Sequence, residues 1–499
     1  MPQPAERIRV TLIPGDGVGP EVVNAARRII EAAGVAIEWE EAEAGSEVFR
    51  KGDPSGVPSE TIASIERTRV VLKGPLETPV GFGEKSANVT LRKLFETYAN
   101  VRPVRELPGV PTRYAGEGID FVVVRENVED LYAGIEYLQT PDVAMALKPI
   151  SRKGSEKVIR YAFELARREG RRKVTCCTKA NILKMTEGMF KRVFEELATD
   201  YPDIQADHLI VDNAGHQMVK APAQFDVTVM TNMNGDILSD VASGLVGGLG
   251  FAASGNYGDG VAIFEAVHGS APKYAGKDVI NPTALILSSV MMLRHLGEHD
   301  AATKIENAVM VTLESGEAVT QDLARIAGSD VEEATSTTGY TDAVIANLGR
   351  APSKEVDRVA RGIGDRGALP DPPARWSYAP KRYAAVARKL VGVDVYIETD
   401  LPVEELGPKL EKLAPKPLKL ALISSRGITV YPAEAAADDV RWYRCRFLVS
   451  EGKTDDATVE KALAKLLEQI TPKHRWVQVA KLHTFNGEPG YTRPAGAGS

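Results

Sequence analysis

The 499-residue sequence contains only three cysteines, Cys176, Cys177 and Cys445. The first two are adjacent in an apolar segment, which suits a buried strand better than a disulfide or a zinc site. The sequence also lacks any run of 18 apolar residues, and its first residues lack the charged-then-apolar pattern of a signal peptide. These absences predict a cytoplasmic protein that does not bind a membrane.

An excess of positive charge is missing as well. The 61 Lys and Arg residues are outnumbered by 68 Asp and Glu residues, which gives a formal net charge of −7. Because nucleic-acid-binding proteins must neutralise phosphate groups, this balance argues against nucleic acid as the main partner. The chain is longer than one hydrophobic core usually supports, so we expect two or three domains.

Strand-like and helix-like segments alternate through the first 350 residues. Residues 7–13 form a β-branched run that leads into the glycine-rich turn 14–20 and a helical pattern over 21–33. Similar strands are predicted at residues 68–74, 119–125, 173–178, 208–212 and 227–232. This alternation predicts a largely parallel α/β sheet with binding groups at the carboxyl ends of its strands.

The composition changes after this region. Residues 352–389 combine several prolines with many charges, which is typical of an inter-domain connection. Beyond it the pattern predicts a strand, a helix, two strands, a helix and a strand, at residues 391–399, 402–413, 418–424, 442–450, 458–470 and 476–482. This β-α-β-β-α-β order predicts a ferredoxin-like domain.

Two short motifs match known sites but lack their context. Gly362, Gly364 and Gly367 have the spacing of a dinucleotide-binding fingerprint, yet they follow a charged segment of the connection and not a strand. His295 and His299 have the spacing of a helical metal pair, but no third ligand lies nearby in the sequence. We interpret the first motif as linker and the second as ordinary helix-end histidines.

Residues 78–92 combine a glycine loop with the start of a helix, where backbone N–H groups favour an anion. Ser86 and Asn88 add neutral hydrogen-bonding groups, although either could simply cap the helix. Arg92, Arg102 and Arg125 together suit a ligand with several carboxylate groups, because a guanidinium group forms bidentate hydrogen bonds with a carboxylate. The alternative is that each arginine only forms a surface ion pair.

Asp236 and Asp240 are four residues apart, directly after a predicted strand. Carboxylate oxygens at this spacing suit Mg²⁺ or Mn²⁺, although a solvated acidic helix face would have the same spacing. Tyr132 closes the stretch that follows Arg125 and places a phenol where a general acid could act.

Six motifs, in this order, resemble the β-decarboxylating dehydrogenases and specifically the isocitrate dehydrogenases; they are residues 14–21, 86–92, 125–132, 178–181, 234–240 and 268–276. The resemblance covers residues 8–350, and the added domain resembles the longer bacterial form of the Thermus type. It implies an α/β isocitrate/isopropylmalate dehydrogenase-like fold, which is not a Rossmann fold, followed by the C-terminal ferredoxin-like domain. The implied domains are a large cofactor-binding domain (1–98 and 247–350), a small substrate, metal and dimer-interface domain (99–246), a linker (351–390) and the C-terminal domain (391–499).

The resemblance also implies an activity, namely oxidative decarboxylation of isocitrate to 2-oxoglutarate and CO₂ with NADP⁺ and Mg²⁺ or Mn²⁺. The implied substrate-binding residues are Thr78, Ser86, Asn88, Arg92, Arg102 and Arg125. The catalytic pair is Tyr132 and Lys179, and the metal ligands are Asp212, Asp236 and Asp240. Members of this family are homodimers with shared active sites, to which Lys179 and Asp212 of one chain contribute in the other.

The implied cofactor-binding residues are His268, Gly269, Lys273, Tyr274, Asn281, Asp322 and Arg325. Lys273, Tyr274 and Arg325 suit the 2′-phosphate of NADP, whereas NAD-using members carry an acidic residue at the position of Lys273. Gln321 departs from the tyrosine of many NADP-using members, which leaves strict preference open.

Homoisocitrate and 3-isopropylmalate remain alternative substrates. The polar residues Ser86 and Asn88 disfavour the isopropyl group, whereas homoisocitrate keeps the third carboxylate and is harder to exclude. The C-terminal domain is alternatively a separate regulatory binding module.

Overall fold

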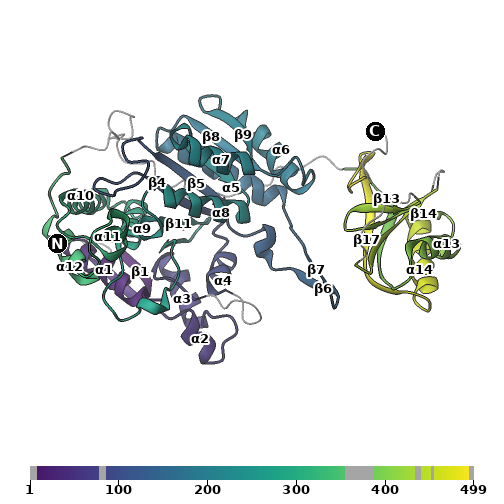
Figure 1. The fold of residues 1–499 in the computed structure, drawn as a ribbon, viewed down its shortest axis with the longest axis horizontal. Coiled ribbons are helices and arrows are strands. Elements are labelled where there is room, and N and C mark those ends of the chain that lie inside the picture. The colour runs from purple at the N-terminus through teal and green to yellow at the C-terminus, as the bar shows by residue number, and fades with distance from the viewer. Residues whose placement is uncertain (1–7, 78–85, 354–385, 433–439, 451–453, 494–499) are drawn as a thin grey trace, which may run out of the picture. The chain divides into compact units, whose positions relative to one another are not determined.

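The computed structural model describes residues 8–77, 86–353, 386–432, 440–450 and 454–493. The chain forms two compact units, of which the first contains residues 1–133 and 148–379 and the second residues 134–147 and 380–499 (Figure 1). The glycine motif at residues 362–367 and Thr78 lie outside the described residues. None of the helices in the described ranges is long and apolar enough to cross a membrane.

The first unit is built on one ten-stranded sheet of order β2-β1-β3-β12-β11-β4-β5-β10-β8-β9. The strands pair in parallel at both ends of the sheet and antiparallel in the middle, where β11 joins β12 to β4 and β4 pairs with β5. Their bounds are β1 (Ile8–Ile13), β2 (Ile37–Glu41), β3 (Val70–Lys73), β4 (Ala99–Arg105), β5 (Asp120–Glu126), β8 (Lys173–Thr178), β9 (Gln205–Ile210), β10 (Val227–Met230), β11 (Ala253–Tyr257) and β12 (Ala262–Ala266). The predicted largely parallel α/β sheet is confirmed.

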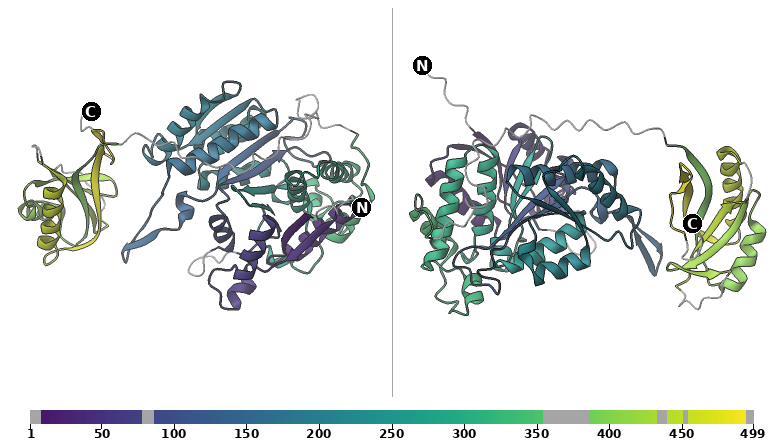
Figure 2. Two further views of the ribbon diagram at one scale, coloured as in Figure 1. Left: turned by 180° about the vertical axis from the view of Figure 1, so that it is seen from behind. Right: turned by 90° about the horizontal axis from the view of Figure 1, so that it is seen from above.

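Helices cover both faces of this sheet (Figure 2). They are α1 (Gly19–Ala32), α2 (Ser46–Arg50), α3 (Ser59–Thr68), α4 (Ala87–Leu94), α5 (Arg152–Arg168), α6 (Thr186–Ala198), α7 (Val211–Lys220), α8 (Asn232–Leu245), α9 (Thr283–His295), α10 (His299–Ser315), α11 (Gln321–Ala327) and α12 (Thr337–Ala346), with short 3₁₀ turns η1 (Asp130–Ala133), η2 (Pro222–Gln224), η3 (Leu249–Phe251) and η4 (Pro272–Tyr274).

Successive strand residues enter different cores, because side chains alternate between the two faces of a sheet. In β3, Val70 and Leu72 pack with α1 and α9, whereas Val71 packs on the opposite face with α3 and α4. In the other half of the sheet, α5 and α6 cover one face and α7 and α8 the other. Burial on both faces explains why these strands are continuous apolar runs in the sequence.

One strand prediction was wrong in its bounds. Residues 208–212 were expected to be a strand, but β9 runs from Gln205 to Ile210 and α7 begins at Val211. Because β9 is the exposed edge of the sheet, its first residues are polar and give no apolar signal. His295 ends α9 and His299 begins α10, so the two histidines do not share a helix face.

The second unit contains a six-stranded antiparallel sheet of order β15-β14-β16-β13-β17-β18. Its elements are β13 (Arg388–Glu398), α13 (Val403–Leu413), β14 (Leu418–Ser425), β15 (Ile428–Tyr431), β16 (Trp442–Val449), α14 (Asp456–Ile470), β17 (Arg475–Phe485) and β18 (Glu488–Pro489). The predicted β-α-β-β-α-β order is therefore confirmed, with β15 and β18 added at the sheet edges. The hairpin β6 (Glu136–Thr140) and β7 (Val143–Ala146) also belongs to this unit.

Candidate functional site

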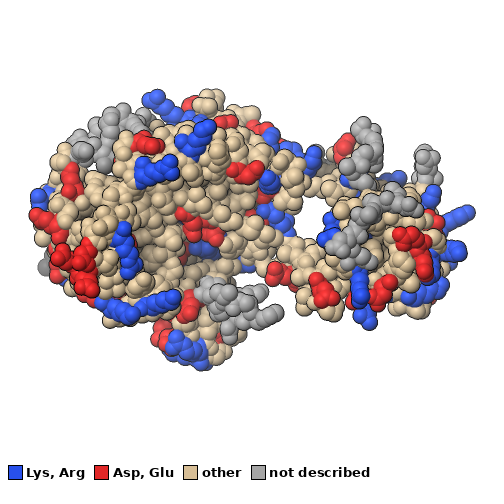
Figure 3. Space-filling model, in the orientation of Figure 1, with Lys and Arg blue, Asp and Glu red and all other residues tan. Residues whose placement is uncertain are grey.

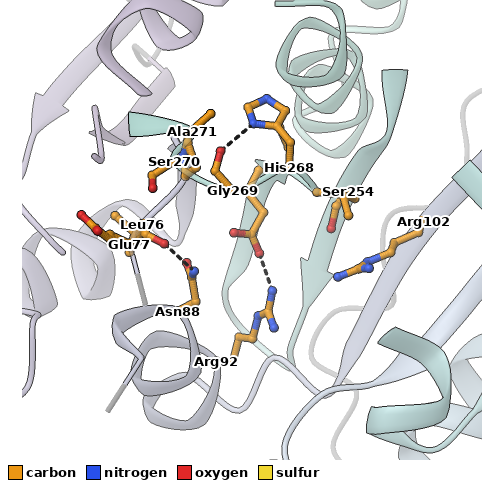
Figure 4. A pocket seen from close by; sticks show the side chains of 14 residues that line it. Leu76, Glu77, Asn88, Arg92, Arg102, Ser254, His268, Gly269, Ser270 and Ala271 are labelled. Carbon is orange, nitrogen blue, oxygen red and sulfur yellow. Dashed lines mark hydrogen bonds and ion pairs between the residues drawn. The ribbon is translucent and has the colours of Figure 1, made fainter. Parts of the chain in front are cut away.

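A pocket of about 470 Å³ lies at the carboxyl ends of β3 and β12 and beside α4. Its lining includes Asn88, Arg92, Arg102, Glu265 and His268. Figure 4 shows Asn88 and Arg92 on α4 facing the segment from His268 to Ala271, with Arg102 entering from β4, which β11 separates from β12. Five of the residues predicted for the site, Asn88, Arg92, Arg102, His268 and Gly269, therefore line one pocket.

Three polar atoms around this pocket are buried and have no hydrogen-bond partner among the described residues, namely Asn88 Oδ1, Arg92 Nε and His268 Nε2. His268 Nδ1 donates to the carbonyl oxygen of Gly269 at 3.0 Å, and burial lowers the pKa of His268, which favours its neutral form. Unpaired buried polar groups are unfavourable. A ligand with both donors and acceptors would satisfy them.

Glu265 joins two cations at the base of the pocket. Its carboxylate lies 2.5 Å from Lys73 Nζ and 2.9 Å from Arg92 Nη2. Burial acts to raise the pKa of Glu265, but Lys73 and Arg92 outweigh this effect and hold the pKa well below its usual range. Neither Lys73 nor Glu265 was predicted. Their signal in the sequence is a single charge within each otherwise apolar strand, β3 and β12.

Beside the pocket, α8 brings a pair of aspartates against two buried arginines. Arg102 Nη1 lies 3.1 Å from Asp240 Oδ1 and Arg102 Nη2 lies 3.3 Å from Asp236 Oδ1, while Arg125 also pairs with Asp236. Gly235 permits this close approach, because a Cβ at that position would lie 2.7 Å from the Arg125 side chain.

The charges in this cluster alter one another. Burial and the neighbouring arginines lower the pKa of Arg125 to about 9. Burial acts to raise the pKa of Asp236, but Arg125 and Arg102 outweigh it, so this pKa is lowered. For Asp240, burial outweighs the opposing effect of Arg102 and raises the pKa. Asp236 is therefore an anion that already faces the predicted substrate-binding arginines.

Tyr132, on η1, completes this cluster. Its hydroxyl donates a hydrogen bond to Asp236 Oδ2, and the Arg125 guanidinium lies 4.8 Å from the centre of its ring. Burial and the hydrogen bond to Asp236 raise the pKa of Tyr132. The phenol therefore keeps its proton at neutral pH and can act as an acid.

The other predicted catalytic residue lies apart from Tyr132. Lys179 Nζ is 2.7 Å from Asp212 Oδ1, and the side chains are 35% and 67% exposed. The predicted site residues are thus gathered in two separate groups. In the described part of the chain, no three His, Cys, Asp or Glu side chains come together as a metal site. Within one chain, Asp212 does not join Asp236 and Asp240.

The predicted cofactor residues lie beside the pocket and along its exposed side. His268 and Gly269 line it, while Asn281 Nδ2 donates to Asp322 Oδ2 at 3.0 Å. Lys273 on η4 and Arg325 on α11 are exposed, and neither has a carboxylate partner among the described residues. Ser86 precedes α4, but its side chain makes no capping bond.

Comparison with known proteins identifies the family of the chain. Residues 9–344 match the isocitrate/isopropylmalate dehydrogenase family, and residues 388–497 match the bacterial isocitrate dehydrogenase C-terminal domain. The chain belongs to the isocitrate/isopropylmalate dehydrogenase family. Its second matched domain further groups it with the long bacterial members.

Several relatives cover nearly the whole chain. It is 58% identical to an NADP isocitrate dehydrogenase of Thermus thermophilus, over 98% of this chain and 95% of that protein. It is 38% identical to an NADP isocitrate dehydrogenase of Rickettsia bellii, over 99% and 100%. Among solved structures, the TT0538 protein of Thermus thermophilus superposes with a TM-score of 0.91 at 57% identity, covering 99% of this chain and 97% of that one.

Proposed function

We propose that this protein catalyses the oxidative decarboxylation of isocitrate to 2-oxoglutarate and CO₂ with reduction of NADP⁺, assisted by Mg²⁺ or Mn²⁺. The observation that carries the proposal is that Arg92 and Arg102 line the pocket, while Arg125 lies beside them against a carboxylate pair and a protonated phenol. Three guanidinium groups match a tricarboxylate in charge.

Asp236 and Asp240 would hold the metal ion, with Asp212 supplied by a second chain. Their hard oxygen atoms suit Mg²⁺ or Mn²⁺, and the bound cation would polarise the substrate hydroxyl and carbonyl oxygens. Arg102 and Arg125 would then exchange their aspartate partners for substrate carboxylates. In this arrangement Ser86 and Asn88 bind the same substrate, as does Thr78.

Two side chains would move protons. Lys179 would take part in removing the proton from the substrate hydroxyl, and bound NADP⁺ would supply the acceptor for the hydride from C2. Tyr132 donates its proton to the carbon atom from which CO₂ has departed, because its raised pKa keeps the phenol protonated. Asp236 accepts a hydrogen bond from the Tyr132 hydroxyl and so orients it.

NADP would bind along the His268–Tyr274 segment and the start of α11. His268, Gly269, Asn281 and Asp322 would contact the dinucleotide. Lys273, Tyr274 and Arg325 provide two cations and a phenol for the 2′-phosphate, and the two cations have no competing carboxylate among the described residues.

We further propose a cytoplasmic homodimer in which each site uses residues of both chains. Helices α7 and α8 pack on each other through buried residues such as Met218 and Leu238, yet Val219, Ile237 and Val241 remain 46%, 56% and 40% exposed. A second copy would cover this apolar surface and would bring its own Lys179 and Asp212 to the Tyr132 cluster. In each chain, the large domain (1–98 and 247–350) and small domain (99–246) would enclose the pocket.

Initial rates test this function. With Mg²⁺ present, isocitrate and NADP⁺ should give the highest kcat/KM among pairs of isocitrate, homoisocitrate or 3-isopropylmalate with NADP⁺ or NAD⁺. The comparison with 3-isopropylmalate is needed because this chain is 47% identical to a chloroplastic 3-isopropylmalate dehydrogenase of Solanum tuberosum, over 62% of this chain and 86% of that protein. A higher kcat/KM for either competing acid would overturn the substrate assignment.

A further inference from the structure

Lys148 lies in a buried group of three charges that the proposed mechanism does not use. Its Nζ is 2.7 Å from Asp130 Oδ1 and 2.7 Å from Glu187 Oε1. Both carboxylate side chains are 0% exposed and that of Lys148 is 14% exposed. Burial acts to lower the pKa of Lys148, but the two carboxylates outweigh it and raise the pKa, so the ammonium group stays charged.

One carboxylate fixes the segment that carries Tyr132. Asp130 accepts hydrogen bonds from Leu131 N at 2.7 Å and from Met233 N, in the first turn of α8, at 3.0 Å. Its backbone φ of +67° lies in the left-handed region, which few non-glycine residues adopt. These contacts hold η1 against the helix that presents Asp236.

The other carboxylate fixes the segment that carries Lys179. Glu187 Oε2 accepts a hydrogen bond from Lys179 N at 3.2 Å, and Glu187 Oε1 accepts from Thr231 Oγ1, directly before α8, at 3.0 Å. Asp130 and Glu187 therefore tie two different loops to the same end of α8. The Lys148 ammonium group is the link between them.

We propose that Lys148 is a positioning residue that fixes the positions of Tyr132 and Lys179 relative to each other. This inference rests on the proposed roles of those two residues. Without the ammonium group, two buried carboxylates face each other with no cation between them, and repulsion moves both loops. In the proposed dimer, Tyr132 and Lys179 of one chain serve different active sites, so Lys148 links the geometry of both sites.

The test compares Lys148→Met with a matched variant, Lys157→Met. Lys157 also bridges two carboxylates, at 3.0 Å from Glu96 and 2.9 Å from Asp259, and its side chain is 8% exposed, but these partners are not site residues. Lys148→Met should lower kcat by about 10²-fold, as expected for misplaced reacting groups, while the KM values for isocitrate and NADP⁺ change little. Lys157→Met should lower only the Tm.

Two further variants keep the test decisive. Lys148→Arg should recover part of the lost kcat, because a guanidinium group can also bridge two carboxylates. Glu187→Gln retains the Lys148–Asp130 pair and should fold even where Lys148→Met does not; it should also lower kcat without a matching change in KM. The proposal would be overturned if Lys148→Met had the same kcat as Lys157→Met. Where Lys148→Met does not fold, Glu187→Gln takes its place in this comparison.

The reduction of oxalosuccinate by NADPH distinguishes the effect of the substitution on the Tyr132 loop from its effect on the Lys179 loop. This reaction bypasses the protonation step assigned to Tyr132 but still requires proton transfer at the hydroxyl oxygen, assigned to Lys179. Lys148→Met should slow it as well, and an unchanged rate would contradict the link to Lys179. Failure of the wild-type protein to oxidise isocitrate would instead contradict the proposed function, so the two failures are distinguishable.

Discussion

The charged residues of the site neutralise one another. Arg102 and Arg125 pair with Asp236, and Arg92 pairs with Glu265, so each guanidinium is held in place before a substrate arrives. If these arginines bind the substrate as proposed, Arg92 and Arg102 need little rotation, because they already line the pocket. Binding would then involve an exchange of the arginines' carboxylate partners, and not the simple addition of an anion to free cations.

Tyr132→Phe removes the phenolic hydroxyl, and with it the proton and the hydrogen bond to Asp236, but keeps the ring. We expect kcat to fall on the order of 10²-fold with a much smaller change in the KM for isocitrate, because the phenol is assigned to proton transfer. Steady-state rates measure both quantities. Reduction of oxalosuccinate, which does not need this proton, should stay comparatively active. An unchanged kcat would remove Tyr132 from the mechanism.

Lys273→Glu combined with Tyr274→Ile should move the cofactor preference from NADP⁺ toward NAD⁺. A carboxylate repels the 2′-phosphate and can accept a hydrogen bond from a free 2′-hydroxyl, so kcat/KM for NADP⁺ should fall by roughly three orders of magnitude. Arg325→Ala alone should raise the KM for NADP⁺ with little change for NAD⁺. The exposed Lys461→Glu, with the same change in net charge as Lys273→Glu, serves as the control. An unchanged ratio of the two kcat/KM values would place the 2′-phosphate site elsewhere.

The sequence predicted the residues that lie in continuous motifs but not their distant partners. Ser86 to Arg92 and Asp236 to Asp240 are each contained in one loop-and-helix segment, so their spacing indicates a shared face. Lys73 and Glu265 are 192 positions apart and meet only because β3 and β12 are adjacent in the sheet. No local pattern reveals such a pair.

At the level of elements, the central strands were the hardest to predict. In β11 (Ala253–Tyr257), glycine, serine and asparagine replace the apolar side chains that mark the other strands. The structure shows why the strand is nevertheless buried. Asn256 Oδ1 accepts hydrogen bonds from Asn100 at 2.6 Å and Asn127 at 2.9 Å, and its amide nitrogen donates to Glu265 at 2.8 Å. A network of amides stabilises the middle of the sheet.

The end of β5 predicts a pH effect on stability. Glu126 is buried, its carboxylate accepts hydrogen bonds from Val128 N and Glu129 N, and burial raises its pKa from 4.5 to about 7. Between these values the folded protein binds more protons than the unfolded chain, so Glu126 lowers stability as the pH rises from 4.5 to 7. This difference in the pKa of Glu126, from 4.5 to about 7, corresponds to about 3 kcal/mol in the free energy of unfolding.

Glu126→Gln removes this titration. The Tm of the variant relative to wild type should therefore increase by several degrees between pH 5 and pH 8, as measured by calorimetry. The exposed Glu117→Gln is the matched control and should show no such trend. A Tm difference for Glu126→Gln that is independent of pH would mean that Glu126 is ionised in the folded protein throughout this range.

At the scale of the whole molecule, the ten-stranded sheet carries a hydrophobic core on each face of each of its halves. Tyr257 and Met291 pack against one core in each half, so shared apolar contacts join the two halves of the first unit. The second unit has its own core. Figure 3 shows acidic and basic side chains interspersed over the visible face of the first unit. The described apolar surface on α7 and α8 is therefore a better candidate than charge for holding two chains together.

The shared site of the proposed dimer can be tested by mixing two inactive proteins. In Lys179→Met, Tyr132 is intact; in Tyr132→Phe, Lys179 is intact. If each site takes Tyr132 from one chain and Lys179 from the other, a mixed dimer contains one site with neither defect and one site with both. Random pairing makes half of the dimers mixed, so the mixture should recover about a quarter of wild-type activity.

Exchange of subunits by mild denaturation and refolding, followed by assay with isocitrate and NADP⁺, measures this recovery. Each variant refolded alone gives the background, and two differently tagged chains report how many mixed dimers have formed. Lys179 lies next to the exposed Asp212 and apart from Tyr132, which is the arrangement that complementation requires. Activity no higher than the background, in a sample with mixed dimers demonstrated, would mean that Tyr132 and Lys179 act within one chain. Domain movement would then have to bring the two groups together.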